Sequence, residues 1–304
     1  MVGVNHPSTI YVIGAAGQLG TAVLSSHAVP AGSRVVAMGS SDIDISSPDS
    51  VDAALTDLTT GDIVLNVAAF TDVDGAETER AAAFAVNADG PAHVASATSA
   101  AGAHLIHVST DYVFPRAAWA SPLEPSDLPA DAVPETVYGA SKLAGERAVL
   151  RADPNAVVVR TAWVFTGRPP VRDFVTTMQR LEGERDEVTV VDDQRGSPTY
   201  APDLAGGLWE LAESLRSGSL GGGEVLHATN GGEATWCDLA RAVFAGIGAD
   251  PSRVKPCSTD QFPRAAPRPT YSVLSAASWV GAGLTPLRDW PDALGDALDA
   301  SSSG

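Results

Sequence analysis

The heptapeptide GAAGQLG at residues 14–20 constrains the fold of this chain more than any other feature. It follows an apolar run at residues 9–13 directly and opens a helical stretch, which is the context of a dinucleotide-binding turn. Glycines there let the backbone approach a pyrophosphate, which sits on free N–H groups at the helix start. The alternative is a glycine-rich turn without a ligand. We favour cofactor binding, and the predicted contacts in this turn are Gly14, Gly17, Gln18 and Leu19.

Short apolar runs alternate with longer amphipathic stretches over the first half of the chain. The runs are continuous and β-branched, which is typical of strands buried on both faces of a parallel sheet, and the intervening helices suit right-handed crossovers. We therefore predict an α/β fold with a Rossmann-type, doubly wound parallel sheet. The expected strands are residues 9–14, 34–38, 62–69, 104–109 and 156–165.

The rhythm of the sequence changes after about Phe165, where turn-rich segments separate the helical ones. A chain of 304 residues is long for one core, since single cores stop growing at roughly 250–300 residues. Further helices are expected at 174–181, 203–215, 235–245 and near Trp290, and a short strand at 225–228. We predict a dinucleotide-binding domain at 1–165, completed by about 203–230, and a smaller C-terminal substrate-binding lobe formed by 166–202 and 231–304.

Charge and composition exclude several classes of partner. A formal net charge of −18 would repel phosphate backbones, which argues against nucleic acid or an anionic membrane. No run approaches the ~20 apolar residues of a membrane span, and the N-terminal segment lacks the features of a secretory signal, so we expect a cytoplasmic protein. Cys237 and Cys257 are the only cysteines and have no ligand-like spacing. Neither a disulfide nor a metal site is predicted.

The end of the second strand carries no acid where a ribose-binding carboxylate usually stands in this fold. Ser40 and Ser41 occupy that position. Their hydroxyls could donate to a 2′-phosphate that no carboxylate repels, so NADPH is the predicted cofactor and NADH the alternative. Asp44 and Ile45, slightly later, either flank the adenine or form the approach to the next helix.

The third strand ends in small residues. Ala68 and Ala69 would line the nicotinamide side and leave room for the cofactor.

Asn87, in the following helical region, is expected to hold its helix in place by hydrogen bonds to the backbone. That role would be structural but close to the site.

Tyr138 and Lys142 are spaced so that they project from one face of a helix. A phenol has a pKa near 10, and we expect the neighbouring ammonium to bring the pKa of Tyr138 closer to working pH while it also binds the nicotinamide ribose. An exposed helix pair is the structural alternative. Thr110, at the end of the preceding strand, would donate to a substrate carbonyl, and it favours the catalytic interpretation.

Taken together, these segments resemble the dTDP-4-dehydrorhamnose reductase family of extended short-chain dehydrogenases. The resemblance spans nearly the whole chain and includes GAAGQLG (14–20), VSTDYVF (108–114) and VVDDQRGSPTYAPDLA (190–205). Within these segments, the strings that distinguish this family best are GQLG (17–20), STDYVF (109–114) and DQRGSPT (193–199). Further matching segments are DIDIS (42–46), NVAAFTDVDGAE (66–77), AVNADGPAHVA (85–95), YGASKLAGE (138–146), RTAWVF (160–165), ATWCDLA (234–240) and PRPTYSVL (267–274).

The resemblance implies reduction of the carbon-4 ketone of dTDP-4-dehydro-L-rhamnose to dTDP-L-rhamnose, a polysaccharide precursor. Tyr138 would protonate the alkoxide, Thr110 would hold the carbonyl, and Lys142 would tune Tyr138 and clamp the ribose. It also implies substrate contacts from Tyr112, Trp163, Gln194, Ser197, Thr199 and Arg268. For Trp163 the alternative is a core residue, and for Arg268 a solvated surface residue.

Several positions depart from the family pattern. Pro115-Arg116 replaces a common Asp-Gly and begins an insertion-like stretch to Pro134, Asp173 replaces an Asn, and Tyr271 occupies another Asn position. These departures bear on loop geometry and nucleotide preference, and not on Thr110, Tyr138 and Lys142. Interface magnesium occurs in some members, but no acidic ligands are assigned here, and a monomer or a homodimer is expected.

Two other functions compete with the reductase. An epimerase or dehydratase on the same scaffold is disfavoured because a dehydratase needs an acid pair after Thr110, whereas Asp111 is followed by Tyr112. A non-catalytic regulatory subunit, like the dehydrogenase-like partner of methionine adenosyltransferase, is disfavoured by the intact Thr110, Tyr138 and Lys142.

Overall fold

The computed structural model describes residues 8–116 and 119–302. Its centre is a six-stranded sheet in the order β10-β5-β4-β3-β1-β2, in which every pair of neighbours is parallel. The predicted doubly wound sheet is confirmed. Its strands are β1 (Thr9–Ile13), β2 (Arg34–Met38), β3 (Ile63–Asn66), β4 (His104–Thr110), β5 (Val157–Thr161) and β10 (Val225–His227).

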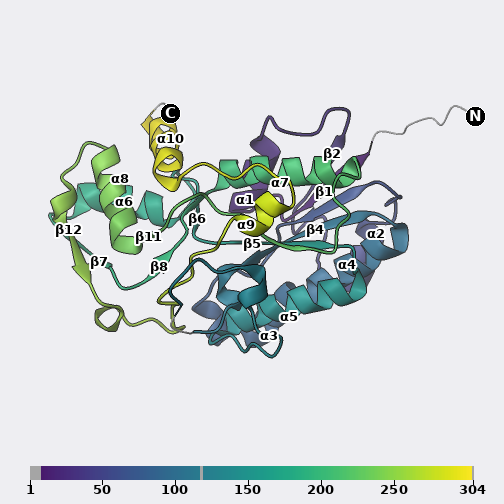
Figure 1. Cartoon of the computed structure of the whole chain (residues 1–304), viewed down its shortest axis with the longest axis horizontal. Helices are drawn as coiled ribbons and strands as arrows, with labels where there is room; N and C mark the ends of the chain where they lie inside the picture. The colour runs from purple at the N-terminus through teal and green to yellow at the C-terminus, as the bar shows by residue number, and fades with distance from the viewer. Residues whose placement is uncertain (1–7, 117–118, 303–304) are drawn as a thin grey trace, which may run out of the picture.

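Helices cover both faces of this sheet (Figure 1). One face packs against α1 (Gln18–Ser25) and α7 (Ala201–Arg216). The other face packs against α2 (Pro48–Ala54), α4 (Gly90–Ala101) and α5 (Val137–Ala152), with α3 (Arg80–Phe84) and the π-helix η2 (Ala85–Asp89) beside α5. The inner strands β1, β3, β4 and β5 are buried on both faces, which explains why their sequences are nearly continuous apolar runs.

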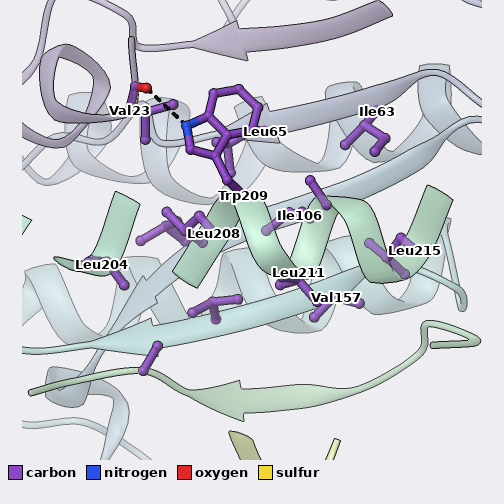
Figure 2. Packing of buried hydrophobic residues seen from close by; sticks show 14 of the residues in the cluster. Val23, Ile63, Leu65, Ile106, Val157, Leu204, Leu208, Trp209, Leu211 and Leu215 are labelled. Carbon is purple, nitrogen blue, oxygen red and sulfur yellow. Dashed lines mark hydrogen bonds between the residues drawn. The ribbon is translucent and has the colours of Figure 1, made fainter. Parts of the chain in front are cut away.

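Helix α7 is the element that brings the later part of the chain back onto the sheet. Its Trp209 is 1% exposed and its indole N–H donates to the carbonyl of Val23 at 3.0 Å. Figure 2 shows this bond among leucine, isoleucine and valine side chains from α7 and the strands. A buried indole requires such a partner for its N–H, so the contact fixes α7 against α1.

A second core lies at the other end of the molecule and contains Phe165, Tyr200, Val243 and Phe244. Its elements are β6 (Val164–Phe165), α6 (Phe174–Glu184), β7 (Val188–Val191), β8 (Arg195–Gly196), β9 (Thr199–Tyr200), β11 (Ala234–Thr235), α8 (Trp236–Gly246), β12 (Val254–Cys257) and α10 (Trp290–Ser302); α9 (Ala277–Gly281) packs near β10. The helices expected at 174–181, 203–215 and 235–245 are confirmed. The division into two domains at the stated residues stays a prediction, and it accords with these separate cores.

One expected strand is broken. Residues 156–165 form β5 and β6 instead of a single strand, because Trp163 has a positive φ of 47° and turns the chain out of the sheet. β6 then pairs with β9. The break occurs at the carboxyl edge of the sheet, where it directs Trp163 toward the candidate site.

Candidate active site

A cavity of about 900 Å³ opens at the carboxyl ends of the central strands. In open parallel sheets this edge is where ligands bind. Its walls are the glycine-rich turn after β1, the ends of β2, β3 and β4, and the first turns of α5. Trp163 and Trp236 line it as well, and Trp236 belongs to α8. The cavity therefore reaches from the sheet to the second core.

The glycine-rich turn packs too closely for side chains. Gly14 has a φ of +86°, and a Cβ there would lie 2.6 Å from the backbone nitrogen of Ala68. A Cβ on Gly20 would lie 2.2 Å from the carbonyl oxygen of Gly14. Helix α1 begins after Gly17 without a side-chain cap. Its first N–H groups are thus not satisfied by a capping side chain, and an anion could accept from them.

Every predicted cofactor contact lies on the cavity wall: Gly14, Gly17, Gln18, Leu19, Ser40, Asp44, Ile45, Ala68, Ala69, Tyr138 and Lys142. Gln18 is held in place because its amide donates to the carbonyl of Val164 at 3.2 Å. The dimensions and the uncapped helix fit a dinucleotide. Two buried hydroxyls on the wall, of Ser109 and Thr161, have no hydrogen-bond partner among the described residues, which is expected of groups that serve a ligand.

Carboxylates near the end of β2 bond to their own loop. Asp42 accepts from the backbone N–H of Gly39 at 2.8 Å, and Asp44 accepts from the N–H and hydroxyl of Ser46 at 3.0 and 2.6 Å. The bonds from Ser46 lower the pKa of Asp44. These bonds support the interpretation of Asp44 as a turn residue. Asp44 also lines the cavity, and its contact with the adenine stays a prediction.

The three residues predicted to be catalytic, Thr110, Tyr138 and Lys142, converge on the cavity from β4 and α5. Tyr138 lies in the first turn of α5, which begins where the Thr136 hydroxyl accepts from the N–H of Gly139 at 2.9 Å. The ammonium of Lys142 donates to the carbonyl of Val108 at 2.7 Å. Thr110, at the end of β4, lies against Tyr138 and lowers its pKa by hydrogen bonding. Both helical residues are buried, at 9% and 2% exposure.

Burial governs the charge states of this trio. It raises the pKa of Tyr138 to about 12, outweighing the hydrogen bond from Thr110, and lowers the pKa of Lys142 to about 8. The expectation that Lys142 brings the pKa of Tyr138 closer to working pH is wrong in this structure. The reason is that the ammonium is directed to the Val108 carbonyl while the phenolate would be desolvated. Tyr138 therefore keeps its proton at neutral pH.

Asp111 is a third titratable group at the site, next to Tyr138 and Lys142. It is 2% exposed, and its carboxylate accepts from the Thr110 hydroxyl at 3.0 Å. Burial raises the pKa of Asp111 to about 6, against the lowering effect of the hydroxyls of Ser272 and Thr110.

Aromatic rings form the far wall of the cavity. Trp163 stacks on Trp236 with ring centroids 3.5 Å apart and planes 7° apart, and Tyr112 meets Tyr138 edge-on at 5.5 Å. Gly196 makes room for the indole, since a Cβ there would lie 2.5 Å from the ring of Trp163. Trp163 is half-buried, so it is neither a plain core residue nor a free ring. Trp236 was missed by the sequence reasoning, although the matching segment ATWCDLA contains it.

Four predicted substrate contacts lie away from the cavity wall. Gln194 donates to Thr259 at 3.0 Å, Ser197 accepts from the N–H of Leu274 at 3.1 Å, and Thr199 donates to the carbonyl of Ser197 at 3.2 Å. These three side chains hold the 194–199 loop. Arg268 pairs with Asp74 at 2.9 Å, so it is an ion-paired side chain rather than a solvated one.

Asn87 anchors the π-helix η2 to its surroundings. Its side chain accepts from the N–H of Phe70 at 2.8 Å and donates to the Phe70 carbonyl and the Ser141 hydroxyl, each at 3.0 Å. The predicted hydrogen bonds to the backbone are confirmed. They link the loop after β3 to α5.

Within residues 8–116 and 119–302, no group of three or more His, Cys, Asp or Glu side chains could hold a metal ion. None of the helices in that part of the chain is long and apolar enough to cross a bilayer.

The chain is similar to known proteins over almost its whole length. A family model described as the RmlD substrate binding domain matches residues 8–303. The dTDP-4-dehydrorhamnose reductase of Mycobacterium tuberculosis is 50% identical over 298 residues, which cover 97% of this chain and 93% of that protein. A probable dTDP-4,6-dihydroxy-2-methyloxan-3-one 4-ketoreductase of Streptomyces antibioticus is 45% identical over 288 residues, covering 94% and 93%.

A solved structure agrees with this relationship. The dTDP-4-dehydrorhamnose reductase of Bacillus anthracis, in complex with NADP, has a TM-score of 0.86 and 32% identity, covering 97% of this chain and 99% of that one. The resemblance seen in the sequence motifs is thereby confirmed. The chain belongs to the dTDP-4-dehydrorhamnose reductase family.

Proposed function

We propose that this protein reduces the carbon-4 ketone of dTDP-4-dehydro-L-rhamnose to dTDP-L-rhamnose, with NADPH as the reductant. The relatives named above support the substrate and the cofactor. The observation that carries the proposal is the placement of Tyr138, Thr110 and Lys142 together on the cavity wall at the ligand-binding edge of the sheet.

The chemistry needs a hydride at carbon 4 and a proton at its oxygen, and NADPH supplies the hydride when bound. Thr110 would turn its hydroxyl from the Asp111 carboxylate to the ketone oxygen and donate its one hydrogen bond there, and Tyr138 would transfer its phenolic proton to the alkoxide that forms. Burial raises the pKa of Tyr138, so the phenol keeps its proton until the alkoxide, a stronger base, forms. Lys142 would bind the nicotinamide ribose.

The cofactor would lie along the wall already described. Its pyrophosphate would accept from the N–H groups at the start of α1, near Gly17. Ala68 and Ala69 would flank the nicotinamide, and Ser40 would lie near the adenosine ribose, where its hydroxyl could donate to a 2′-phosphate. NADH is the alternative cofactor.

The substrate sugar would lie against Tyr112 and Trp163, which line the cavity. Gln194, Ser197 and Thr199 would shape the pocket by holding their loop. Arg268 would reach the diphosphate only after leaving Asp74. We further propose a cytoplasmic monomer or homodimer that binds neither nucleic acid nor membrane.

Reduction of another 4-keto nucleotide sugar is the second candidate. The Streptomyces relative with a different 4-ketoreductase name favours it, as does a dTDP-4-keto-6-deoxy-D-glucose reductase of Streptomyces niveus at 41% identity over 291 residues. An epimerase or dehydratase is less well supported, because Tyr112 stands where a second acid would be needed. A regulatory subunit would leave the proton donor without a purpose.

Incubation of the purified protein with NADPH and dTDP-4-dehydro-L-rhamnose tests the proposal through the loss of reduced-nicotinamide absorbance. Tyr138→Phe should bind NADPH normally and lose a factor of about 10² to 10⁴ in turnover, the usual contribution of a general acid. Tyr11→Phe, in a buried tyrosine on β1 outside the cavity, is the matched control. NADPH binding without consumption would point to the regulatory subunit, and an unimpaired Tyr138→Phe would remove Tyr138 from the mechanism.

A further inference from the structure

Helix α5 carries a third buried polar residue in line with its two catalytic ones. Tyr138, Lys142 and Glu146 are four residues apart, so they lie on one stripe of the helix, and Glu146 is 2% exposed. The proposed mechanism uses the first two and leaves Glu146 without a role. A carboxylate this deeply buried needs a partner to remain charged.

That partner is Arg160 on β5. Two of its nitrogens donate to the two carboxylate oxygens of Glu146 at 3.0 and 2.8 Å, and the side chains are 4% and 3% exposed. A pair with two parallel hydrogen bonds fixes the relative orientation of the two side chains. The free energy of desolvating both buried charges is about as large as the free energy gained from their attraction. Stability alone is therefore a weak reason for its presence beneath the site.

The pair continues into a chain of hydrogen bonds that leaves the helix. Arg160 approaches Nε2 of His227 at 3.4 Å, and Nδ1 of His227 lies 2.9 Å from the carbonyl of Leu123. Burial and the Arg160 charge lower the pKa of His227 to about 3, so the ring is neutral, with its proton on Nδ1. Leu123 in turn bridges to Leu274, whose N–H donates to Ser197. The catalytic helix is thus tied to two loops near the substrate end.

The charges that act on Lys142 are few. Among the residues that the structure describes, Glu146 is the one carboxylate that raises the pKa of Lys142 against the lowering effect of burial. From β4, His107 packs nearby with 0% exposure; burial and then the Lys142 charge hold its pKa well below its usual range, so it carries no charge. The other titratable groups on elements packed against α5 are Glu77, Arg80, Asp89, His93, His104, Asp111 and Tyr112.

We propose that Glu146 is a positioning residue for the reduction: its buried pair with Arg160 fixes α5 against β5, and its negative charge keeps Lys142 protonated for the cofactor ribose. This rests on the proposed function, in which Lys142 clamps that ribose. Glu146 is not among the residues that line the cavity, so it would act through Lys142 and not by direct contact with a ligand.

The test measures NADPH binding by fluorescence in the full chain between pH 6 and pH 9. Wild-type affinity should fall as Lys142 loses its proton near pH 8. In Glu146→Gln the midpoint should move to lower pH by on the order of one unit, as expected for removing a nearby charge in a medium of effective dielectric about 20. Glu146→Asp keeps the charge and should restore the midpoint.

A second variant separates charge from packing. Arg160→Met breaks the same ion pair but leaves the Glu146 carboxylate, so the pH midpoint of NADPH binding should not move to lower pH. If Glu146 had a purely structural role, Arg160→Met and Glu146→Gln would shift this midpoint alike. Arg160→Met also provides a test if the Glu146→Gln protein does not fold. Glu213→Gln, in the exposed pair with Arg216, is the control and should match wild type.

The outcomes distinguish this inference from the proposed function. Wild-type protein that fails to bind NADPH contradicts the function itself. Wild-type binding that does not change between pH 6 and pH 9 overturns the inference, and so does a Glu146→Gln midpoint equal to that of wild type.

Discussion

A methyl group added at Gly145 should push helix α5, which carries Tyr138 and Lys142, away from the π-helix η2. A Cβ at Gly145 would lie 2.0 Å from the backbone carbonyl oxygen of Asn87, and real Cβ atoms do not approach closer than 3.0 Å. That carbonyl belongs to η2, whose position is fixed by the Asn87 side chain, so it cannot rotate away. In Gly145→Ala, α5 and η2 must therefore move apart by about 1 Å.

The consequences follow from the position of Tyr138 and Lys142 on the same helix. Overpacking of this kind costs about 1–3 kcal/mol, and misplacing catalytic groups by about 1 Å lowers turnover by about 10²-fold. We expect urea unfolding to show a loss of about 2 kcal/mol and the steady-state assay to show kcat reduced by about two orders of magnitude.

Gly206→Ala is the matched control, because Gly206 lies inside α7 and no atom stands within 4 Å of a Cβ there. It should stabilise the protein by about 0.5–1 kcal/mol, since alanine loses less backbone freedom than glycine on folding. A Gly145→Ala protein as stable and as active as wild type would refute the close approach of α5 to η2.

Two further predictions concern the site. Burial raises the pKa of Asp111 from 3.8 to about 6, so the folded state binds this proton more tightly than the unfolded state does. The resulting stabilisation of the fold is fully present below pH 3.8, the pKa in the unfolded state, and is lost as the pH rises through about 6, the pKa in the folded state. Unfolding of wild type and Asp111→Asn at pH 4 and pH 7 should thus show the variant gaining about 2 kcal/mol relative to wild type at the higher pH, and an unchanged difference would contradict the shift. Trp236→Ala removes the ring stacked on Trp163. Because such aromatic pairs contribute about 0.5–1.5 kcal/mol, the variant should raise KM for the nucleotide sugar by up to about tenfold and leave NADPH affinity unchanged. A KM equal to that of wild type would exclude a role of the stacked pair in substrate binding.

The sheet could be predicted because its signal is local. Continuous β-branched runs such as residues 157–159 can bury both faces only inside a parallel sheet, and a glycine-rich turn after the first strand places the ligand edge. The positive φ of Trp163 could not be predicted in this way. It depends on packing against Trp236 and Gly196, which lie far along the chain.

Site residues could be predicted where their type and spacing alone indicate their chemistry. They could not be placed where their position depends on a partner distant in the sequence. Tyr138, Lys142 and Thr110 meet as the spacing indicated. Arg268 could not be placed, because its partner Asp74 lies 194 residues away in the sequence. The pKa of Tyr138 was misjudged for a similar reason: helix spacing gives the neighbour on the helix, whereas desolvation depends on the surrounding fold.

The fate of the hydride tests the central claim most directly. The protein would be incubated with dTDP-4-dehydro-L-rhamnose and NADPH carrying deuterium at the transferable position of the nicotinamide, and the product examined by proton NMR. Direct reduction predicts dTDP-L-rhamnose with deuterium at carbon 4 of the sugar, formed in step with NADPH loss. A product without deuterium at carbon 4, or no product despite bound NADPH, would contradict the account.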